Sequence, residues 1–476
     1  MPWSHGERAD ARAEGAGSLS SRTRRVVNAV EEVATIAALT HDGEGVVRDG
    51  KAAFIAGALP GESVRFRRTR HHRQHDEAQL LEVLQPSPDR VVPQCAHFGV
   101  CGGCALQHLA PEAQLAAKQT ELRENLERVG RVAPEEWLPP LRGPVWSYRR
   151  RARLGAKFVI KKDRVVVGFR ERLAPYVAEV QRCEVLAPPV GEMLAPLAAM
   201  MNGLSIRHRI PQIEVAVADN VIALVLRVLD SPSMEDLTRL REFAAAHSVR
   251  FYLQTAGLES VRALDEDPAT PLEPLHYALP GFNLKLQFRP TDFVQINARI
   301  NEALVERAVE LLDLTPESAV LDLFCGLGNF TLALARKAGR VVGVEGDQGL
   351  VERARHNARL NDIANAEFHL ADLGRPLGAP EAGPSWLKQN FTHVLLDPPR
   401  AGASEVLAAV SRLNPQRVLY ISCHPGSLAR DLGVLVHEHG MKLVAAGVLD
   451  MFPHTTHVES LALLEPGGRK RRGRLE

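Results

Sequence analysis

From about residue 284 onward, the chain alternates between short apolar runs and segments with helical periodicity. The runs AVLDLF, RVVGVEG, THVLLD and RVLYIS have the length and composition of buried strands, and the helical segments GNFTLALARKAG, LVERARHNARLN and SEVLAAVSRL lie between them. Strands that alternate with helices predict a parallel, doubly wound sheet. Ligands bind to such sheets beyond the carboxyl ends of the strands, so the residues that follow each run are the candidates for function.

The 476 residues are too many for a single core, so two or three domains are expected. Residues 27–88 consist of short apolar runs between Asp-Gly and Pro-Gly turns, which predicts a small, OB-like β-barrel. Residues 89–283 contain four cysteines and form the expected central α+β domain, and residues 284–466 form a Rossmann-like α/β domain. Residues 1–26 lack periodicity and are expected to be a disordered arm, and residues 467–476 a basic tail.

Composition narrows the class of protein. With 45% hydrophobic and 24% charged residues, most of the chain should be globular. The N-terminus lacks the apolar core of a secretory signal, and we find no run of about 18 apolar residues that could cross a membrane. In a reducing cytosol, the six cysteines are expected to be ligands, nucleophiles or core residues rather than disulfides. The expectation is a soluble, cytoplasmic protein without a membrane partner.

Two basic segments are candidates for RNA contact, although the net charge of +1 does not by itself indicate a nucleic-acid partner. Residues 65–73, RFRRTRHHR, can form a polar edge strand, but their density of Arg and His favours a strand that faces phosphates. Residues 148–154, YRRRARL, leave two interpretations open. They form a solvated strand edge, or Tyr148 stacks on single-stranded RNA while the arginines contact phosphates.

The loop after the first predicted strand, DLFCGLGNF, has features of a nucleotide-binding loop. Gly326 and Gly328 let the backbone approach a ligand, but the third glycine of a dinucleotide fingerprint is absent. Glu345 follows Gly328 by 17 positions and can accept hydrogen bonds from ribose hydroxyls. NAD and S-adenosylmethionine both fit this pattern. Asp322, expected in the loop, favours S-adenosylmethionine, whose sulfonium and amino group are positive.

Two further strand ends carry reactive side chains. Asp397 begins Asp-Pro-Pro-Arg, in which the prolines hold the backbone, and Cys423 follows the run RVLYIS. Most free cysteines are inert core residues, but a thiol at a strand end above a cofactor crevice is not core. A thiolate beside a methyl donor can add to C6 of uracil and make C5 nucleophilic. A base must then remove the C5 proton, and Glu459, expected near the end of the last strand, is the candidate; a salt-bridged surface glutamate is the alternative.

The segments FVQIN, DLFCGLGNF, LDPPRAG, SCHPGSLARD and MFPHTTHVES occur in this order and together resemble the RNA uracil-C5 methyltransferase family, over roughly residues 30 to 465. The resemblance implies Cys423 as nucleophile and Glu459 as general base. It also implies contacts to S-adenosylmethionine from Gln295, Phe324, Asn329, Glu345, Asp372 and Asp397. The family often has Asn after the cysteine, where this chain has His424, which puts the local hydrogen bonds in doubt. A histidine there could also help to lower the pKa of Cys423.

Four of the other five cysteines form one group, which consists of Cys95, Cys101, Cys104 and Cys183. Four thiols that include a C-x2-C pair fit either zinc or an iron–sulfur cluster, and the number of ligands does not separate the two. The spacing resembles the branch of the family that carries a 4Fe–4S cluster, and the preceding barrel resembles its RNA-binding TRAM domain. That pairing is typical of the 23S ribosomal RNA enzymes rather than the transfer RNA enzyme. It implies a structural cluster without redox turnover.

The resemblance implies an S-adenosylmethionine-dependent RNA (uracil-5-)-methyltransferase. It would form 5-methyluridine at one 23S ribosomal RNA site, of the 1939 type, after flipping the base out of its fold. Two alternatives remain at this point. The substrate is another 23S uridine or transfer RNA, or the chain is a non-catalytic iron–sulfur RNA-binding assembly factor. Binding of S-adenosylmethionine separates the last alternative from the others.

Overall fold

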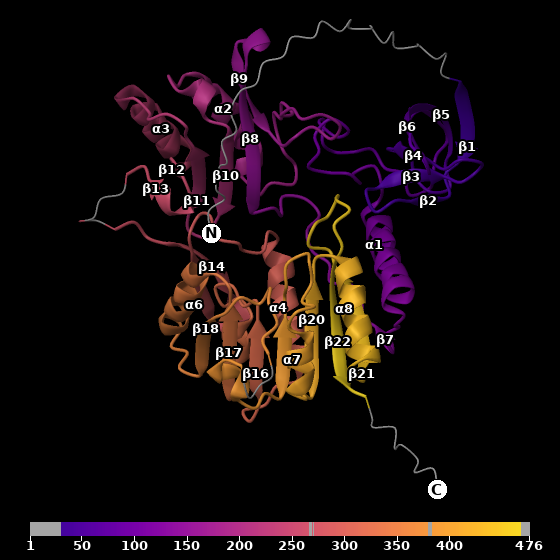
Figure 1. Ribbon diagram of the computed structural model, residues 1–476. Helices are drawn as coiled ribbons and strands as arrows, with labels where there is room; N and C mark the ends of the chain where they lie inside the picture. The colour runs from indigo at the N-terminus through magenta and orange to yellow at the C-terminus, as the bar shows by residue number, and fades with distance from the viewer. Residues whose placement is uncertain (1–29, 266–268, 270, 379–382, 468–476) are drawn as a thin grey trace, which may run out of the picture.

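The computed structural model describes residues 30–265, 269, 271–378 and 383–467. Four sheets organise this part of the chain: a small N-terminal sheet, a central sheet, a two-stranded hairpin and a large C-terminal sheet. Figure 1 shows the central sheet above the C-terminal one, with the small sheet to one side. The predicted arm, residues 1–26, and the predicted tail beyond Gly467 lie outside the described residues. Among the helices described, none is both long and apolar enough to cross a membrane.

The N-terminal sheet has the strand order β1-β5-β6-β4-β3-β2. Its edge strands β1 and β2 are separated in the chain by only Ile36 and Ala37, so the sheet curls until its two edges meet. Ile36, Ile55 and Phe66 fill the inside and are almost completely buried. The result is the barrel-like sheet that the turn pattern predicts. Its strands are β1 (Glu31–Thr35), β2 (Ala38–Leu39), β3 (Glu44–Val47), β4 (Ala53–Ala56), β5 (Ser63–His71) and β6 (Asp76–Gln85).

The central sheet has the order β13-β12-β11-β10-β8-β9 and two helices. Helix α3 begins with a reciprocal capping box, in which Ser233 and Asp236 each accept a backbone N–H of the other. The elements are β8 (Arg151–Val159), β9 (Arg164–Gly168), α2 (Val190–Asn202), β10 (Gln212–Val217), β11 (Ile222–Arg227), α3 (Met234–His247), β12 (Val249–Gln254) and β13 (Arg262–Ala263).

The C-terminal sheet has the order β18-β17-β16-β19-β20-β22-β21-β7. Strands β16 to β20 are parallel and β22 runs antiparallel to β20, so the predicted doubly wound sheet is confirmed. The strand order reverses between β16 and β19, and ligands bind at such a reversal. The elements are α4 (Ala298–Leu312), β16 (Ala319–Leu323), α5 (Thr331–Ala335), β17 (Arg340–Glu345), α6 (Gln348–Leu360), β18 (Ala366–Leu370), β19 (His393–Leu396), α7 (Leu407–Arg412), β20 (Arg417–Ser422), α8 (Pro425–His437), β21 (Met441–Leu449) and β22 (Glu459–Pro466).

Two segments from the predicted central region pack with the C-terminal sheet instead. Strand β7 (Glu136–Trp137) extends that sheet by pairing parallel with β21, and helix α1 (Pro111–Asn125) lies beside α8 (Figure 1). A hairpin of β14 (Leu275–Leu279) and β15 (Leu284–Phe288) also spans the predicted boundary at residues 283–284. The packing of β7 and α1 has no local sequence signal, because it depends on contacts between distant segments.

Candidate active site

The loop after β16 presents its backbone to the crevice at the carboxyl ends of the parallel strands. Phe324, Gly326 and Gly328 have φ values of 67°, 57° and 96°, in the left-handed region that favours glycine. A Cβ added at Gly326 would meet no atom within 4 Å, so space is open beside it. A non-glycine residue such as Phe324 in this conformation stores strain, and such strain clusters at ligand sites. The predicted contact residue Phe324 therefore lies in a loop shaped for close approach to a ligand.

Glu345 ties this loop to the end of β17. Its Oε2 accepts from the Gly326 N–H at 3.0 Å, and its Oε1 accepts from the N–H groups of Gly346 at 2.7 Å and Asp347 at 3.1 Å. A carboxylate has about four acceptor positions, so roughly one remains for a ribose hydroxyl. Asp372 follows β18, and its side chain is 63% exposed and pairs with Arg375 at 3.0 Å. Both predicted residues thus lie at the carboxyl edge of the sheet.

Asn329 is held by residues that the sequence pattern did not indicate. Its Oδ1 accepts from Tyr277 Oη at 2.8 Å and from Asn301 Nδ2 at 3.0 Å. Its Nδ2 donates to Asn301 Oδ1 at 2.9 Å, which leaves one N–H of the amide for a ligand. These bonds determine which way the amide faces.

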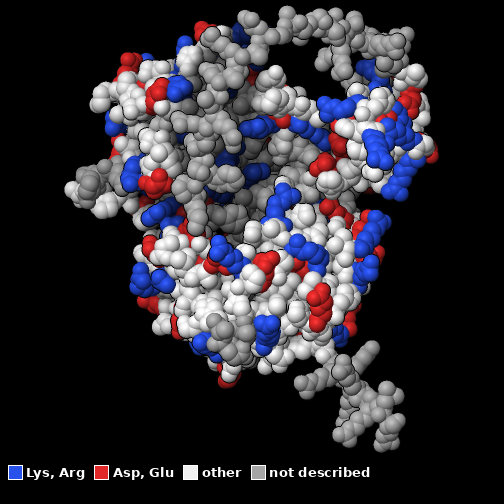
Figure 2. Space-filling model, viewed as in Figure 1, with Lys and Arg blue, Asp and Glu red and all other residues white. Residues whose placement is uncertain are grey.

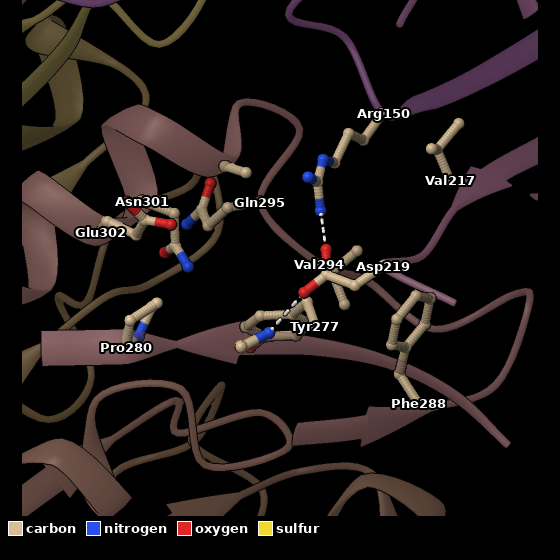
Figure 3. Close-up of a pocket in the computed structure, with 12 residues that line it drawn as sticks. Arg150, Val217, Asp219, Tyr277, Pro280, Phe288, Val294, Gln295, Asn301 and Glu302 are labelled. Carbon is tan, nitrogen blue, oxygen red and sulfur yellow. Dashed lines mark hydrogen bonds and ion pairs between the residues drawn. The ribbon is translucent and has the colours of Figure 1, made fainter. Parts of the chain in front are cut away.

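Gln295 lies in a neighbouring pocket between the central sheet and helix α4. Figure 3 shows Gln295 and Asn301 on one side of this pocket, and the ion pair of Arg150 with Asp219, at 2.5 Å, on the other. Tyr277 also lines the pocket, so Gln295 and Asn329 are connected through shared neighbours. The two predicted cofactor contacts are therefore close in space although they lie on different elements.

Asp322 differs from its prediction. It lies inside β16 rather than in the loop, is completely buried, and accepts from Thr331 Oγ1 at 2.5 Å. Burial raises its pKa to about 7, and the carboxylates of Asp397 and Glu345 add to that shift. Its Oδ1 has no hydrogen-bond partner among the described residues. The prediction was wrong because the apolar run continues on both sides of Asp322, so the strand does not end there.

Three reactive groups meet at the ends of β19, β20 and β22. Ser422 pairs with Ser460 in the antiparallel ladder, so the next residues in register are Cys423 and Glu459. Asp397 follows β19, the strand beside β20. Glu459 is the first residue of β22 rather than near its end, as the sequence suggested. Because β22 is antiparallel, its start lies at the carboxyl edge of the parallel strands.

Burial raises the pKa of all three groups, and neighbouring carboxylates add to the shift at Cys423 and Glu459. Burial raises the pKa of Cys423 to about 11, with added effects from the carboxylates of Glu459 and Asp397 and an opposing one from Arg400. Burial raises the pKa of Glu459 to about 8, Asp397 adds to this shift, and the ammonium of Lys118 opposes it. Burial alone raises the pKa of Asp397 to about 7. A cation in this crevice would favour ionisation of all three groups.

His424 caps helix α8 and does not activate the thiol. Its Nδ1 accepts from the Ser427 N–H at 3.1 Å, and Pro425 occupies the first helical position. Burial and the charges of Arg400 and Arg430 lower the pKa of His424 and so disfavour a positive ring beside the thiol. The expectation that it lowers the pKa of Cys423 is therefore wrong. An Asn side chain could accept the same bond.

The basic segments are partly engaged within the protein. Tyr148 is buried and donates from Oη to the Pro453 carbonyl at 3.0 Å, so the predicted stacking on RNA is wrong. On β5, Arg68 pairs with Glu32 at 2.8 Å and Asp76 at 2.9 Å. Arg65 and Arg70 also pair with carboxylates of the barrel. Intramolecular pairs thus neutralise much of the predicted phosphate-facing strand.

Four of the five remaining cysteines line one small pocket, together with Phe98, Phe169 and Val180. They come from three separate segments: Cys95, the loop Cys101–Cys104, and Cys183 ahead of α2. Burial raises the pKa of Cys101 to about 11 and of Cys104 to about 12, and the nearby thiols add to both shifts. Within the described ranges, no three His, Cys, Asp or Glu side chains are arranged to hold a metal ion.

Comparison with known proteins defines the class of this chain. The model of the tRNA (uracil-5-)-methyltransferase family matches residues 112–377 and 381–466, and the chain belongs to this family. It is 51% identical over 448 residues to the 23S rRNA (uracil(1939)-C(5))-methyltransferase RlmD of Alkalilimnicola ehrlichii, covering 94% of this chain and 99% of that protein. The protein of the same name from Methylococcus capsulatus is 46% identical, with 93% of this chain and 98% of that protein covered.

Among solved structures, the fold is similar to that of the Pyrococcus abyssi tRNA (uracil-54, C5)-methyltransferase in complex with S-adenosyl-L-homocysteine. The TM-score is 0.69, with 21% sequence identity, and the match covers 91% of this chain and 100% of that one. This likeness supports the arrangement of the sheets described above. It extends over the N-terminal and central regions as well as the doubly wound sheet.

Proposed function

We propose that this chain transfers a methyl group from S-adenosylmethionine to C5 of uracil 1939 in 23S ribosomal RNA. The observation that carries the proposal is the register of β20 and β22, which sets Cys423 opposite Glu459 beside Asp397. Relatives that bear this activity in their names match nearly the whole chain at 46–51% identity. S-adenosylmethionine, when bound, supplies a methyl group on a positive sulfonium.

Cys423 and Glu459 carry out separate steps of the proposed reaction. The thiolate of Cys423 bonds to C6 of the flipped uracil, and the electron pair of the C5–C6 double bond moves into the enolate. The electron pair of the enolate would then form the bond from C5 to the methyl carbon, while the bond from that carbon to the sulfonium sulfur breaks and S-adenosylhomocysteine leaves as a neutral thioether. The carboxylate of Glu459 removes the C5 proton, the double bond re-forms, and the C6–sulfur bond breaks to release Cys423. A pKa near 8 suits Glu459 for this step, because a base is most effective when its pKa is near the working pH.

The same proposal assigns the cofactor contacts. Phe324 and Glu345 would meet the nucleoside from the loop after β16 and the end of β17, and Asp372 from the end of β18. Asn329 and Gln295 would approach from the α4 side, and Asp397 lies nearest the reacting groups. Phe324 and Asp397 follow the two strands between which the order of the sheet reverses, β16 and β19, which supports this assignment.

Positive charge between the N-terminal, central and C-terminal sheets supports RNA as the substrate. Figure 2 shows Lys and Arg side chains around the hollow between the central and C-terminal regions. Arg400 faces Cys423, Arg149 lies near Cys183 and His457, and Arg172 lies near Glu44 of the barrel. An RNA phosphate backbone is attracted to positive charge of this kind. Residues 27–88 would then serve as the TRAM domain, residues 89–283 as the central domain and residues 284–466 as the methyltransferase domain.

For the four-cysteine pocket we propose a structural 4Fe–4S cluster. Cys95, Cys101, Cys104 and Cys183 together supply the four thiolates that such a cluster requires. The glycines between Cys101 and Cys104 fit this role, because a Cβ at Gly102 would lie 2.9 Å from the Arg170 carbonyl and one at Gly103 3.2 Å from Phe169. Visible absorbance of anaerobically purified protein, with iron and sulfide analysis, tests the assignment against zinc.

A map of 5-methyluridine in ribosomal and transfer RNA tests the substrate. A strain that lacks the gene should lose the modification at position 1939 and regain it when the gene is restored. Loss at another 23S uridine or in transfer RNA would reassign the substrate. No loss, combined with no binding of S-adenosylmethionine by calorimetry, would favour a non-catalytic assembly factor. Because the proposed substrate is ribosomal RNA, the cytoplasmic location expected from the sequence is part of this proposal.

A further inference from the structure

The loop that carries Glu459 is held by a helix far away in sequence. Residues 450–458 join β21 to β22, and Lys118 of α1 binds this loop at two points. Lys118 Nζ donates to Asp450 Oδ1 at 2.8 Å and to the Phe452 carbonyl at 2.9 Å. The Lys118 side chain is only 2% exposed. Burial of an ion pair is a weak source of stability, because apolar residues of similar volume often replace it without loss. Its value here is that it defines the position of the loop.

Gln114 provides a second anchor, one turn before Lys118 on the same face of α1. Its Oε1 accepts from the His454 N–H at 2.8 Å, and its Nε2 bonds to His454 Nδ1 at 3.1 Å. His454 has φ of 65° and its ring stacks on Trp146 with centroids 3.9 Å apart. A strained residue of this kind persists only where its surroundings hold it in place. The contacts from Gln114 supply that restraint.

The four-cysteine loop contributes to the same anchor. The N–H groups of Ala105 and Leu106 donate to the His454 carbonyl at 2.9 and 3.0 Å. Ala105 directly follows Cys104, and Gln114 Nε2 also donates to the Leu106 carbonyl at 3.0 Å. The segment that runs from the cysteines into α1 therefore binds the loop 450–458 through several hydrogen bonds and the Lys118 ion pair.

We propose that Lys118 and Gln114 are positioning residues, which hold the loop 450–458 so that the Glu459 carboxylate faces the uracil carbon next to Cys423. The inference rests on the proposed function, because it gives these residues a role only if Glu459 acts as the base. The segment after Cys104 is part of the same support. Folding of the cysteine region is thereby coupled to the geometry of the crevice.

The charge of Lys118 has a second effect. Glu459 is faced by Asp397 from the end of β19, by Cys423 from the end of β20 and by Lys118 from α1. Lys118 supplies the positive charge that opposes the raised pKa of Glu459. Removing that charge should move the pH dependence of proton removal to higher pH. If Lys118 served only in packing, removal of its charge would leave the pH dependence of proton removal unchanged.

The test compares Lys118→Met, Lys118→Arg and Gln114→Leu in the full-length protein, with a 23S ribosomal RNA fragment and S-adenosylmethionine. Rapid quenching measures the fraction of RNA bound covalently to protein and the rate of release of methylated RNA. We expect Lys118→Met to slow release by about 100-fold, since a small misplacement can cost that much, and to accumulate the adduct. Release of methylated RNA by Lys118→Met should also require a higher pH than in the wild type. Lys118→Arg should recover part of the rate. Gln114→Leu should slow release and leave the pH midpoint unchanged.

The matched control is Lys442→Met, which breaks an exposed pair with Glu135, at 2.8 Å, at the far end of β21. This variant should release methylated RNA at the wild-type rate. Unchanged release and an unchanged pH midpoint in folded Lys118→Met would overturn the inference. If Lys118→Met does not fold, Lys118→Met combined with Asp450→Leu removes both buried charges and is judged by the same two readouts. If Glu459→Gln forms no adduct, the proposed function has failed, and the inference fails for that separate reason.

Discussion

The chain contains two thiol sites that differ in what surrounds the sulfur. Cys423 is half-buried at the end of a strand, with two carboxylates and Arg400 in electrostatic reach. Cys101, Cys104 and Cys183 are packed against Phe169 and one another. Burial raises the pKa of the thiol in both sites. The two carboxylates beside Cys423 come from separate strands and offer a route for protons, whereas the other pocket gathers four thiols, with His97 and Glu184 also in its lining.

This difference shows that the groups around a cysteine, as well as its thiol, determine the chemistry of the site. Side chains from several strands meet at the carboxyl edge of a parallel sheet, so a thiol there has neighbours of different chemical types. A pocket lined by cysteines from three segments is the site of the proposed cluster, because metal ions stabilise thiolates that otherwise repel one another. The predictions below test the contrast by altering one site at a time.

The largest effect is expected for Cys423→Ala. Without the nucleophile, methyl transfer should fall by at least about 10⁴-fold, because loss of a catalytic nucleophile removes the whole covalent route. Transfer of radioactive methyl groups to 23S ribosomal RNA measures this. Calorimetry should show that S-adenosylmethionine still binds, which serves as the control for folding. Methylation near the wild-type rate would show that Cys423 is not the nucleophile.

Glu459→Gln should reduce turnover by about 10²- to 10⁴-fold and leave RNA covalently attached to the protein. The block falls after methyl transfer, so denaturing gels should show an adduct that carries the methyl label. In the wild type, release should rise with pH through about 8, where Glu459 becomes a carboxylate. Absence of any adduct would separate Glu459 from the release step.

The same carboxyl group affects stability. The pKa of Glu459 is raised from 4.5 to about 8 in the folded protein, so between these values the folded state binds more protons than the unfolded state. Glu459 therefore contributes to a decrease in the free energy of unfolding as the pH rises from about 5 to 8. Glu459→Gln should lose that part of the decrease, which thermal unfolding at pH 6 and pH 9 would detect. An identical pH dependence in both proteins would contradict the raised pKa.

Cys104→Ser tests the other thiol site. It should abolish visible absorbance and lower the free energy of unfolding by several kcal/mol, because metal binding and folding are coupled in such domains. Cys423→Ala is the matched control and should retain full absorbance. Since the segment after Cys104 grips the loop of Glu459, Cys104→Ser should also slow the release of methylated RNA. A coloured Cys104→Ser protein of unchanged stability would remove Cys104 from the proposed ligand set.

The smallest effect is expected at His424. His424→Ala removes the cap of α8 and should cost about 1 kcal/mol of stability, whereas His424→Asn keeps an acceptor for the Ser427 N–H and should cost little. Urea unfolding of the two variants measures the difference. Because the ring does not activate the thiol, methylation by His424→Asn should stay near the wild-type rate. A large loss of activity in that variant would give His424 a role beyond the cap.

Much of the fold could be predicted because its signals are local. The run RVLYIS coincides with β20, and AVLDLF overlaps β16, since a buried parallel strand is a continuous apolar run. The register that sets Cys423 opposite Glu459 was not predictable, although both residues were identified. Strand β18 was missed because AEFHL mixes polar and apolar residues and lies at the edge of the sheet.

Other features depend on which distant segments meet. Lys118 and Asp450 are 332 positions apart, and neither has a neighbour in sequence that indicates a buried pair. Tyr148 is followed by three arginines, a pattern typical of a surface, yet its ring is core and its hydroxyl binds the loop of Glu459. Asp322 similarly lies inside a strand, although a charged residue type is more typical of a loop.

The sequence by itself determined the class of fold, and it singled out Cys423, Glu459 and the group of four cysteines as candidates, because apolar periodicity, strand ends and ligand spacing are properties of short segments. Only the tertiary structure decided how Glu459 is held, how Asn329 is oriented and which arginines remain for RNA. These depend on hydrogen bonds and ion pairs between segments that are separated by tens to hundreds of residues. Their partners are selected when the sheets pack together, and no local pattern specifies them.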